Sequence, residues 1–150
     1  MSTVSWNVQG LFSKIHDHDF ISFVTDFDII VLLETWASKP GLVQLLGFDK
    51  PLEKLTEKKT KFGHNPGGIM VFYKLKYKNY IKELKSQSHS LLWFKLEMQS
   101  VKGKQLYIFC AVYIPPEGSN YADLAVFDIL EEELITYKQR YPEAYFFYRR

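Results

Sequence analysis

The chain has 150 residues, of which 47% are hydrophobic and 17% are aromatic. This composition excludes a disordered polar chain and supplies enough apolar side chains for a single packed domain. The formal net charge of +2 is too small to indicate a nucleic-acid-binding protein by itself, because strong phosphate binders usually carry concentrated basic faces.

The single cysteine and the lack of long apolar segments bear on where the chain works. Cys110 has no second cysteine with which to form an internal disulfide, so a reducing, intracellular setting is favoured. The N-terminal residues are not a basic segment followed by an apolar one. The longest apolar run, residues 106–116, is shorter than the about 20 residues that a membrane-spanning helix needs. We therefore expect a soluble chain with no membrane partner.

The first part of the chain predicts a strand, a helix and a second strand. Residues 4–8 indicate a short strand, and the apolar residues between positions 12 and 24 indicate a helix that lies on a sheet. Residues 29–33 are a continuous β-branched and leucine run, which is typical of a strand covered on both faces. This order predicts a β-α-β unit in an α/β or α+β fold. Residues 40–61 are polar and charged, and we expect a surface loop there.

A double glycine introduces the next strand signals. Residues 67–68 predict a turn that leads into a strand over residues 69–74. Residues 92–98 and 106–114 alternate between apolar and polar side chains on either side of a turn at residues 102–104. This pattern predicts an antiparallel hairpin.

The last part of the chain predicts a helix and a strand. Apolar residues recur at helical spacing from Asn120, the expected N-cap, to Pro142. Residues 144–148 are almost entirely aromatic and indicate a further strand. We find no internal repeat or interdomain linker, so residues 1–150 are treated as one domain.

Two polar residues follow the first two predicted strands. Glu34 comes after five consecutive apolar residues, so its carboxylate should project from the C-terminal end of a buried strand, where open α/β sheets place their sites. Mg²⁺ is commonly held by one or two carboxylates and water, which makes Glu34 a candidate metal ligand. From position alone, a solvated strand-end carboxylate is the better interpretation. Asn7 could bond a phosphate or orient Glu34, or it could bond the local backbone as a turn residue.

A third candidate follows the predicted hairpin. Tyr113 precedes an Ile-Pro-Pro sequence, and the consecutive prolines should stiffen the exit of the strand and hold the phenol in one direction. A phenol can donate a hydrogen bond to a phosphate oxygen. The alternative is an interfacial aromatic side chain, which is common in a chain with ten tyrosines.

Two charged clusters are less informative. Residues 16–19 (His-Asp-His-Asp) combine imidazoles with carboxylates, but metal sites normally gather ligands from separate elements, and Asp19 is expected to cap the following helix. Lys58, Lys59 and Lys61 could touch a nucleic-acid backbone, although a solvated charged loop is the commoner explanation. The sequence has no phosphate-binding loop, dinucleotide fingerprint, CxxC pair or nucleophile elbow.

Four segments together resemble the endonuclease/exonuclease/phosphatase family: residues 6–10 (Trp-Asn-Val-Gln-Gly), 32–36 (Leu-Leu-Glu-Thr-Trp), 67–73 (Gly-Gly-Ile-Met-Val-Phe-Tyr) and 112–116 (Val-Tyr-Ile-Pro-Pro). Their form is most similar to the apurinic-type endonuclease of non-LTR (LINE-like) retrotransposons. The resemblance implies the N-terminal half of a four-layer α/β sandwich of the DNase I-like type. It also implies DNA as a partner and an intracellular location that includes the nucleus.

The resemblance also implies a chemistry. In that family a Mg²⁺- or Mn²⁺-dependent site hydrolyses phosphodiesters. Glu34 would be a metal ligand, and both Asn7 and Tyr113 would be catalytic and would bind the substrate phosphate. The family has a Gly-Asp-x-Asn motif after the strand that resembles residues 144–148, and a Ser-Asp-His segment near its C-terminus. Neither occurs in this sequence.

These missing motifs lead us to expect a partial domain. Residues 1–150 would lack the C-terminal half of the fold, and the chain would be truncated before the second sheet is complete. We expect the chain to be inactive alone, because residues that act as a unit in catalysis are missing, and to self-associate through exposed sheet surface. Two other functions stay open: a non-catalytic module that binds nucleic acid or protein, and a phosphatase that acts on a small phosphoester.

Overall fold

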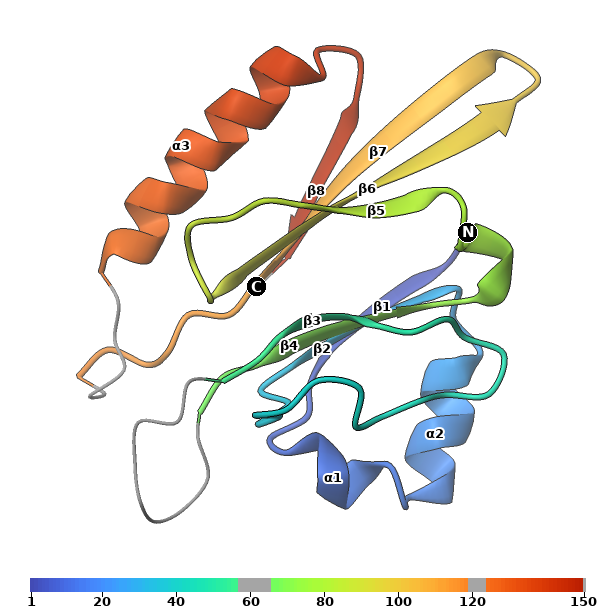
Figure 1. The fold of residues 1–150 in the computed structure, drawn as a ribbon, viewed down its shortest axis with the longest axis vertical. Coiled ribbons are helices and arrows are strands. Elements are labelled where there is room, and N and C mark those ends of the chain that lie inside the picture. Colours follow the sequence, from blue (N-terminus) through green and yellow to red (C-terminus); the bar gives the residue numbers. More distant parts are fainter. Residues whose placement is uncertain (57–65, 119–123, 150) are drawn as a thin grey trace. The chain divides into compact units, whose positions relative to one another are not determined.

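The computed structural model describes residues 1–56, 66–118 and 124–149. The chain forms two compact units, residues 1–78 and residues 79–150 (Figure 1). Each unit contains one four-stranded sheet. The charged residues Lys58, Lys59 and Lys61 and the expected helix cap Asn120 lie outside the described residues.

The first unit is built on a parallel pair of strands. Its elements are β1 (Thr3–Asn7), α1 (Leu11–Lys14), α2 (His18–Thr25), β2 (Ile29–Leu33), β3 (Leu52–Lys54), β4 (Ile69–Tyr73) and the 3₁₀ turn η1 (Leu75–Tyr77). The strand order is β1-β2-β4-β3; β1 is parallel to β2, and β4 is antiparallel to both β2 and β3. The predicted β-α-β unit is therefore confirmed.

Two details of this unit differ from the sequence-based expectation. The single helix predicted between residues 12 and 24 is two helices, because Asp17 caps the second one: its carboxylate accepts the backbone N–H groups of Asp19 at 3.0 Å and Phe20 at 3.2 Å. The expectation that Asp19 is the cap is therefore wrong. The segment 40–61 was expected to be a loop throughout, but it contains β3, whose three residues are too few to show a periodic pattern.

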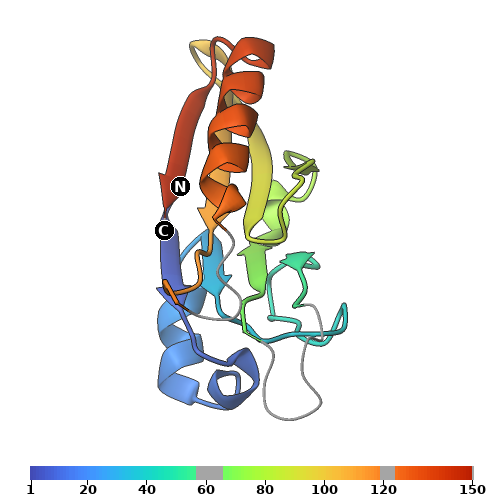
Figure 2. The ribbon, with the colours of Figure 1, turned by 90° about the vertical axis from the view of Figure 1, so that its left-hand side faces the viewer.

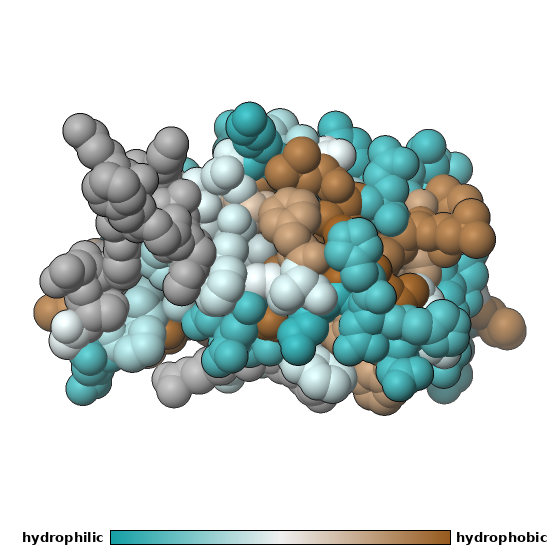
Figure 3. All heavy atoms as spheres, turned by 90° about the horizontal axis from the view of Figure 1, so that it is seen from below, coloured by the Kyte–Doolittle hydropathy of each residue, from teal (hydrophilic) through white to brown (hydrophobic). Residues whose placement is uncertain are grey.

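The core of the first unit lies between one face of the sheet and its helices. Alternate residues of β2 and β4 pack there against α2: Ile30, Leu32, Met70, Phe72, Phe20 and Val24. These side chains are at most 9% exposed. Some aromatic side chains of the same helices remain exposed, Phe12 at 42% and Phe23 at 46%. Figure 3, which views the molecule from the side of α1 and α2, shows apolar patches between hydrophilic side chains.

Asp28 joins the start of β2 to two other segments of the first unit. Its carboxylate accepts the Ser2 backbone N–H at 2.8 Å and lies 2.7 Å from the Lys76 ammonium. Burial by itself would raise the pKa of Asp28. The hydrogen bonds from Lys76 and Ser2 and the charges of Lys76 and Lys74 outweigh burial and lower the pKa from 3.8 to about 2. The ionised carboxylate therefore stabilises the folded unit.

The second unit is a mainly antiparallel sheet with one long helix. Its elements are β5 (Ile81–Leu84), β6 (Leu91–Ser100), β7 (Gly103–Val112), α3 (Ala125–Arg140) and β8 (Tyr145–Arg149), and the strand order is β5-β6-β7-β8. The predicted hairpin is β6 and β7, and its turn comes slightly earlier than expected because Ser100 pairs with Gly103. The predicted strand near residues 144–148 is β8, which runs parallel to β7.

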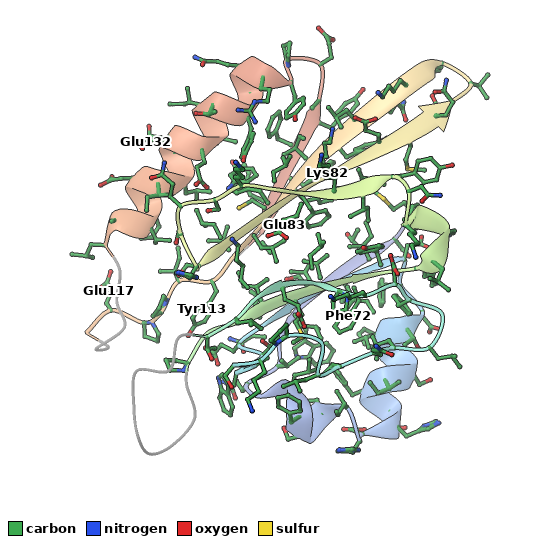
Figure 4. The ribbon with its side chains drawn as sticks, in the orientation of Figure 1. Phe72, Lys82, Glu83, Tyr113, Glu117 and Glu132 are labelled. Atoms are coloured by element: carbon green, nitrogen blue, oxygen red, sulfur yellow. The ribbon has the colours of Figure 1, made fainter. Side chains whose placement is uncertain are left out.

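Strand β5 was not expected from the sequence. Its burial pattern is buried, exposed, exposed, buried, so it lacks the strict alternation that marks a strand. Lys82 and Glu83 are the exposed pair (Figure 4). Cys110 is buried, and burial raises the pKa of its thiol. Among the described residues, no helix is both long and apolar enough to cross a membrane.

Helix α3 runs along one face of the second sheet (Figure 2). Its residue Glu133 forms hydrogen bonds with several other parts of this unit. The Glu133 carboxylate accepts three hydrogen bonds: from the Trp93 indole N–H at 2.8 Å, the Ser86 hydroxyl at 2.9 Å and the Gln87 backbone N–H at 2.7 Å. The Tyr137 hydroxyl, one turn further along, donates to the Lys85 carbonyl. Glu133 and Tyr137 thus join the helix to β6 and to the loop between β5 and β6.

We predict that Asp28→Asn lowers the free energy of unfolding by about 1–2 kcal/mol at pH 7, because a shift of one pKa unit is worth about 1.4 kcal/mol and water screens the partly exposed lysine partners. A carboxylate whose pKa is depressed stabilises the fold at pH values above its unfolded-state pKa. The difference in the free energy of unfolding between wild type and Asp28→Asn should therefore become smaller as the pH falls from 3.8 towards about 2. Urea denaturation across this range measures the difference, with Asp26→Asn, at an exposed neighbour, as the control. A difference that does not change with pH would contradict the prediction.

We predict that Glu133→Ala lowers the free energy of unfolding by about 1–3 kcal/mol, because it leaves the buried Trp93 indole N–H without an acceptor. The matched control is Glu132→Ala, whose side chain is exposed on the same helix (Figure 4) and which should change stability by less than about 0.5 kcal/mol. Thermal unfolding followed by circular dichroism distinguishes the two variants. Equal losses would show that the three hydrogen bonds contribute nothing specific.

Candidate functional site

Asn7 and Glu34 lie at the same edge of the first sheet. Because β1 and β2 are parallel, their carboxyl ends meet at one edge. Asn7 is the last residue of β1 and pairs in register with Leu33, the last residue of β2, and Glu34 follows directly. Asn7 is exposed, and Glu34 is partly buried. The structure therefore brings these two sequence-predicted candidates together.

The backbone at this edge is strained. Glu34 has a φ of 55°, in the left-handed region that residues with a Cβ rarely adopt. Gln9 with a φ of 46° and Trp36 with a φ of 57° share this feature, and in the described parts of the chain no other non-glycine residue has a positive φ. Backbone strain of this kind persists only where the surroundings impose it, and it concentrates at functional sites. It therefore singles out the edge that carries Asn7 and Glu34.

Backbone hydrogen bonds from the loop after β1 hold one side of the strained segment. The Glu34 carbonyl accepts the Gly10 N–H at 2.8 Å, and the Thr35 carbonyl accepts the Leu11 N–H at 3.1 Å. The Val8 N–H continues this series by donating to the carbonyl of Leu33 at 2.9 Å. The parallel pairing of β1 and β2 thus extends past the ends of both strands.

The double glycine before β4 holds the other side. The Thr35 N–H donates to the Gly68 carbonyl at 3.2 Å, and the Trp36 N–H donates to the Gly67 carbonyl at 3.0 Å. A Cβ at Gly68 would lie 2.5 Å from the Thr35 hydroxyl oxygen, and Gly68 has a φ of 89°. Only glycine therefore permits this close approach.

Thr35 and Gly10 are parts of the site that the sequence reasoning missed. Thr35 is fully buried, and its hydroxyl has no hydrogen-bond partner among the described residues. A Cβ at Gly10 would lie 2.6 Å from the ring of Trp36, so this glycine is also required by a close contact. The double glycine at residues 67–68 was a usable signal in the sequence: it predicted a turn and it is part of the family resemblance, but neither showed that it holds Thr35 and Trp36 in place.

The Asn7 side chain bonds the local backbone, as one of its two sequence-based interpretations proposed. Its Oδ1 accepts the Gln9 N–H at 3.2 Å, which orients the amide group. The Nδ2 group, a donor, has no acceptor among the described residues. An oriented amide donor at the end of β1 is chemically suited to an anionic oxygen.

Tyr113 belongs to the second unit. It follows β7, it is 9% exposed, and its backbone N–H donates to the Ser90 carbonyl at 2.9 Å (Figure 4). This hydrogen bond continues the pairing of β6 and β7 by one residue and fixes the backbone just before the two prolines. The structure thus places Tyr113 at the carboxyl end of a strand, as it does Asn7 and Glu34, but in a different unit.

The described residues contain no group of three or more histidine, cysteine, aspartate or glutamate side chains that could hold a metal ion. In the 16–19 cluster, His18 and Asp19 are both exposed, with 3.8 Å between Nδ1 and Oδ1, and Asp17 is engaged as a helix cap. At the sheet edge the donor chemistry fits a hard cation, since Glu34 supplies a carboxylate and Mg²⁺ often keeps several waters.

Comparison with known proteins identifies the fold. No family model matches the sequence, and no curated protein matches it. Among solved structures, the chain is similar to the catalytic domain of Xenopus laevis APE2, with a TM-score of 0.59 and 16% identity over 95% of this chain and 52% of that chain. It is also similar to the human Nocturnin catalytic domain with a bound sulfate anion, with a TM-score of 0.53 and 12% identity over 93% of this chain and 59% of that chain.

Both solved structures have DNase I-like folds of the endonuclease/exonuclease/phosphatase type, so this chain has a DNase I-like α/β fold. This confirms the fold class that the sequence predicted. The chain spans 52% and 59% of the lengths of the two solved chains.

We predict that Gly68→Ala lowers the free energy of unfolding by about 2–4 kcal/mol, because the left-handed backbone and the contact with Thr35 both oppose a Cβ. Gly47→Ala is the matched control. Gly47 has a similar φ of 84°, but a Cβ there would meet no atom within 4 Å, so only the backbone cost of about 1–2 kcal/mol applies. Urea denaturation followed by tryptophan fluorescence measures both. A loss in Gly68→Ala no larger than that in Gly47→Ala would show that the Thr35 contact is unimportant.

Proposed function

We propose that the chain is part of a divalent-metal-dependent phosphodiester hydrolase, the DNA-nicking endonuclease of a LINE-like retrotransposon. The observation that supports this most strongly is the strained edge where Asn7 and Glu34 meet. A carboxylate and an oriented amide donor are the two kinds of group that a metal-assisted site needs to hold a cation and a phosphate. On this proposal the partner is DNA and the protein works in the nucleus.

Each candidate residue has a distinct role in the proposal. The Glu34 carboxylate would hold Mg²⁺ or Mn²⁺, and the cation would neutralise negative charge on the phosphodiester. The Asn7 amide, oriented by its bond to Gln9, would donate to a phosphate oxygen. The family resemblance gives Tyr113, in the second unit, the role of a phosphate-binding phenol. The sulfate bound to the Nocturnin catalytic domain supports an anion site on this fold, because sulfate resembles phosphate in charge and shape.

The 150 residues do not supply the whole catalytic set. Neither a Gly-Asp pair nor a Ser-Asp-His segment occurs in the sequence, so the carboxylate and histidine that complete the site in the resembling family have no counterpart. Removing members of a catalytic unit costs orders of magnitude in rate. We therefore propose that these residues bind metal and phosphate weakly and do not hydrolyse DNA by themselves.

We predict that the purified chain does not nick supercoiled plasmid in Mg²⁺ or Mn²⁺, but that Mn²⁺ broadens the amide NMR signals of residues near Asn7 and Glu34. Glu34→Gln should abolish this local broadening, because a neutral amide is a poor ligand for a hard cation. Asp26→Asn, which removes one exposed carboxylate elsewhere in the first unit, should leave it unchanged.

Other outcomes of the same experiments would change the proposal. Nicking that Glu34→Gln removes would contradict the proposed inactivity but support the proposed site. Broadening that persists in Glu34→Gln would contradict Glu34 as the metal ligand. Salt-sensitive DNA binding without any metal effect would favour a non-catalytic binding module. Hydrolysis of a small phosphoester, but not of DNA, would favour a phosphatase.

A further inference from the structure

The loop between β5 and β6 has a serine at every second position, in the sequence Ser-Gln-Ser-His-Ser over residues 86–90. This serine loop, residues 85–90, connects the end of β5 to the start of β6. Gln87 and His89 are exposed, whereas Ser88 between them is only 6% exposed. A polar loop with a buried serine depends on specific hydrogen bonds for its conformation, because it has few apolar side chains to pack.

Helix α3 holds the first half of the serine loop. The Glu133 carboxylate accepts hydrogen bonds from the Ser86 hydroxyl at 2.9 Å and from the Gln87 backbone N–H at 2.7 Å. The Tyr137 hydroxyl donates to the Lys85 carbonyl. Because a carboxylate is a stronger acceptor than a neutral oxygen, Glu133 is expected to be the main anchor of the loop.

Two serine side chains continue this series of hydrogen bonds along the loop. The Ser86 hydroxyl oxygen accepts the Ser88 backbone N–H at 3.1 Å, and the Ser88 hydroxyl oxygen accepts the Ser90 backbone N–H at 3.1 Å. Bonds from a serine hydroxyl to the backbone two residues later are typical of turns. Because Ser86 donates to Glu133 while it accepts from Ser88, the two bonds strengthen each other.

The series ends at Tyr113. The Ser90 carbonyl accepts the Tyr113 backbone N–H at 2.9 Å, one residue beyond the pair Leu91 and Val112 that begins the pairing of β6 with β7. Residues 115 and 116 are prolines, which have no backbone N–H with which to extend this pairing. The bond to Ser90 therefore fixes the backbone of Tyr113 at the point where the pairing of the two strands ends.

We propose that Glu133 is a positioning residue for Tyr113: through the serine loop it holds the backbone that carries the Tyr113 phenol. The inference deepens the proposed function and rests on it for the role of the phenol at the phosphate. The end of a strand pair opens more easily than its middle, and a group that binds a reacting phosphate must keep its place closely. Glu133 supplies that support from α3 without touching the substrate.

The direct test is hydrogen exchange of the Tyr113 amide, measured by NMR on the full chain. Ser88→Ala removes the last side-chain link, and the Tyr113 amide should then exchange about threefold to tenfold faster, as expected for the loss of one hydrogen bond. The amides of Phe94 and Phe109, which pair in the middle of the hairpin, should keep their wild-type rates. Ser88→Thr, which keeps the hydroxyl, should restore slow exchange at Tyr113.

Ser100→Ala is the matched control for Ser88→Ala. The Ser100 hydroxyl oxygen accepts the Lys102 backbone N–H at 3.2 Å, which is the same kind of bond, but at the turn at the other end of the hairpin. This variant should leave exchange at Tyr113 unchanged.

Glu133→Gln tests the helix end of the series. An amide has one acceptor oxygen where a carboxylate has two, so at least one bond to the serine loop is lost. The Tyr113 amide should again exchange about threefold to tenfold faster. Glu132→Gln, the same change at an exposed neighbour on α3, should have no effect.

Titration with inorganic phosphate separates this inference from the proposed function. Phosphate should shift the NMR signals of Tyr113 in wild type, and Ser88→Ala should need about threefold more phosphate for the same shift. If phosphate does not shift Tyr113 in wild type, the role assigned to the phenol fails. The exchange rates still decide whether Glu133 positions the backbone of Tyr113.

Two results would overturn the inference. Exchange in Ser88→Ala that becomes faster by the same factor at Tyr113, Phe94 and Phe109 would show that the serine loop only stabilises the unit as a whole. Exchange at Tyr113 that is the same in wild type, Ser88→Ala and Glu133→Gln would show that the pairing of β6 with β7 holds Tyr113 unaided.

Discussion

The conformation of residues 34–36 depends on hydrogen bonds from two separate loops, and the candidate site depends on that conformation. The amide groups of Gly10 and Leu11 hold one side, and the carbonyl groups of Gly67 and Gly68 hold the other. A left-handed backbone at Glu34 costs free energy that only such surroundings can offset. If β2 slipped by one residue against either neighbouring strand, every side chain would change face and the hydrogen bonds would be lost.

The two units combine apolar packing with a few buried polar contacts. In each, alternate strand residues pack against helices and make a core. The alternation of apolar residues along the strands does not determine where the loops lie. In each unit, hydrogen bonds to one carboxylate help to fix the position of a loop or a terminal segment. Asp28 holds Ser2 and Lys76 in the first unit, and Glu133 holds the loop before β6 in the second. Each carboxylate joins segments that are far apart in the sequence.

The elements that could be predicted from the sequence are those with a strong local pattern of apolar residues. The runs at residues 29–33 and 69–73 and the hairpin were recognised because five or more residues repeat a clear pattern. Strands β3 and β5 have only three and four residues, and they form because a neighbouring strand offers a partner. The break between α1 and α2 was missed because Asp17 and Asp19 are both good caps by type, and only the backbone geometry distinguishes them.

The sequence by itself determined the α/β class and the positions of Asn7 and Glu34 at strand ends, because these follow from the order and periodicity of apolar residues. It could not determine the left-handed backbone of Glu34 or the buried hydroxyl of Thr35. Those features arise from contacts between distant positions, such as Thr35 with Gly68. Only the tertiary structure decided them, because such contacts depend on how strands pair and not on any one strand's own pattern.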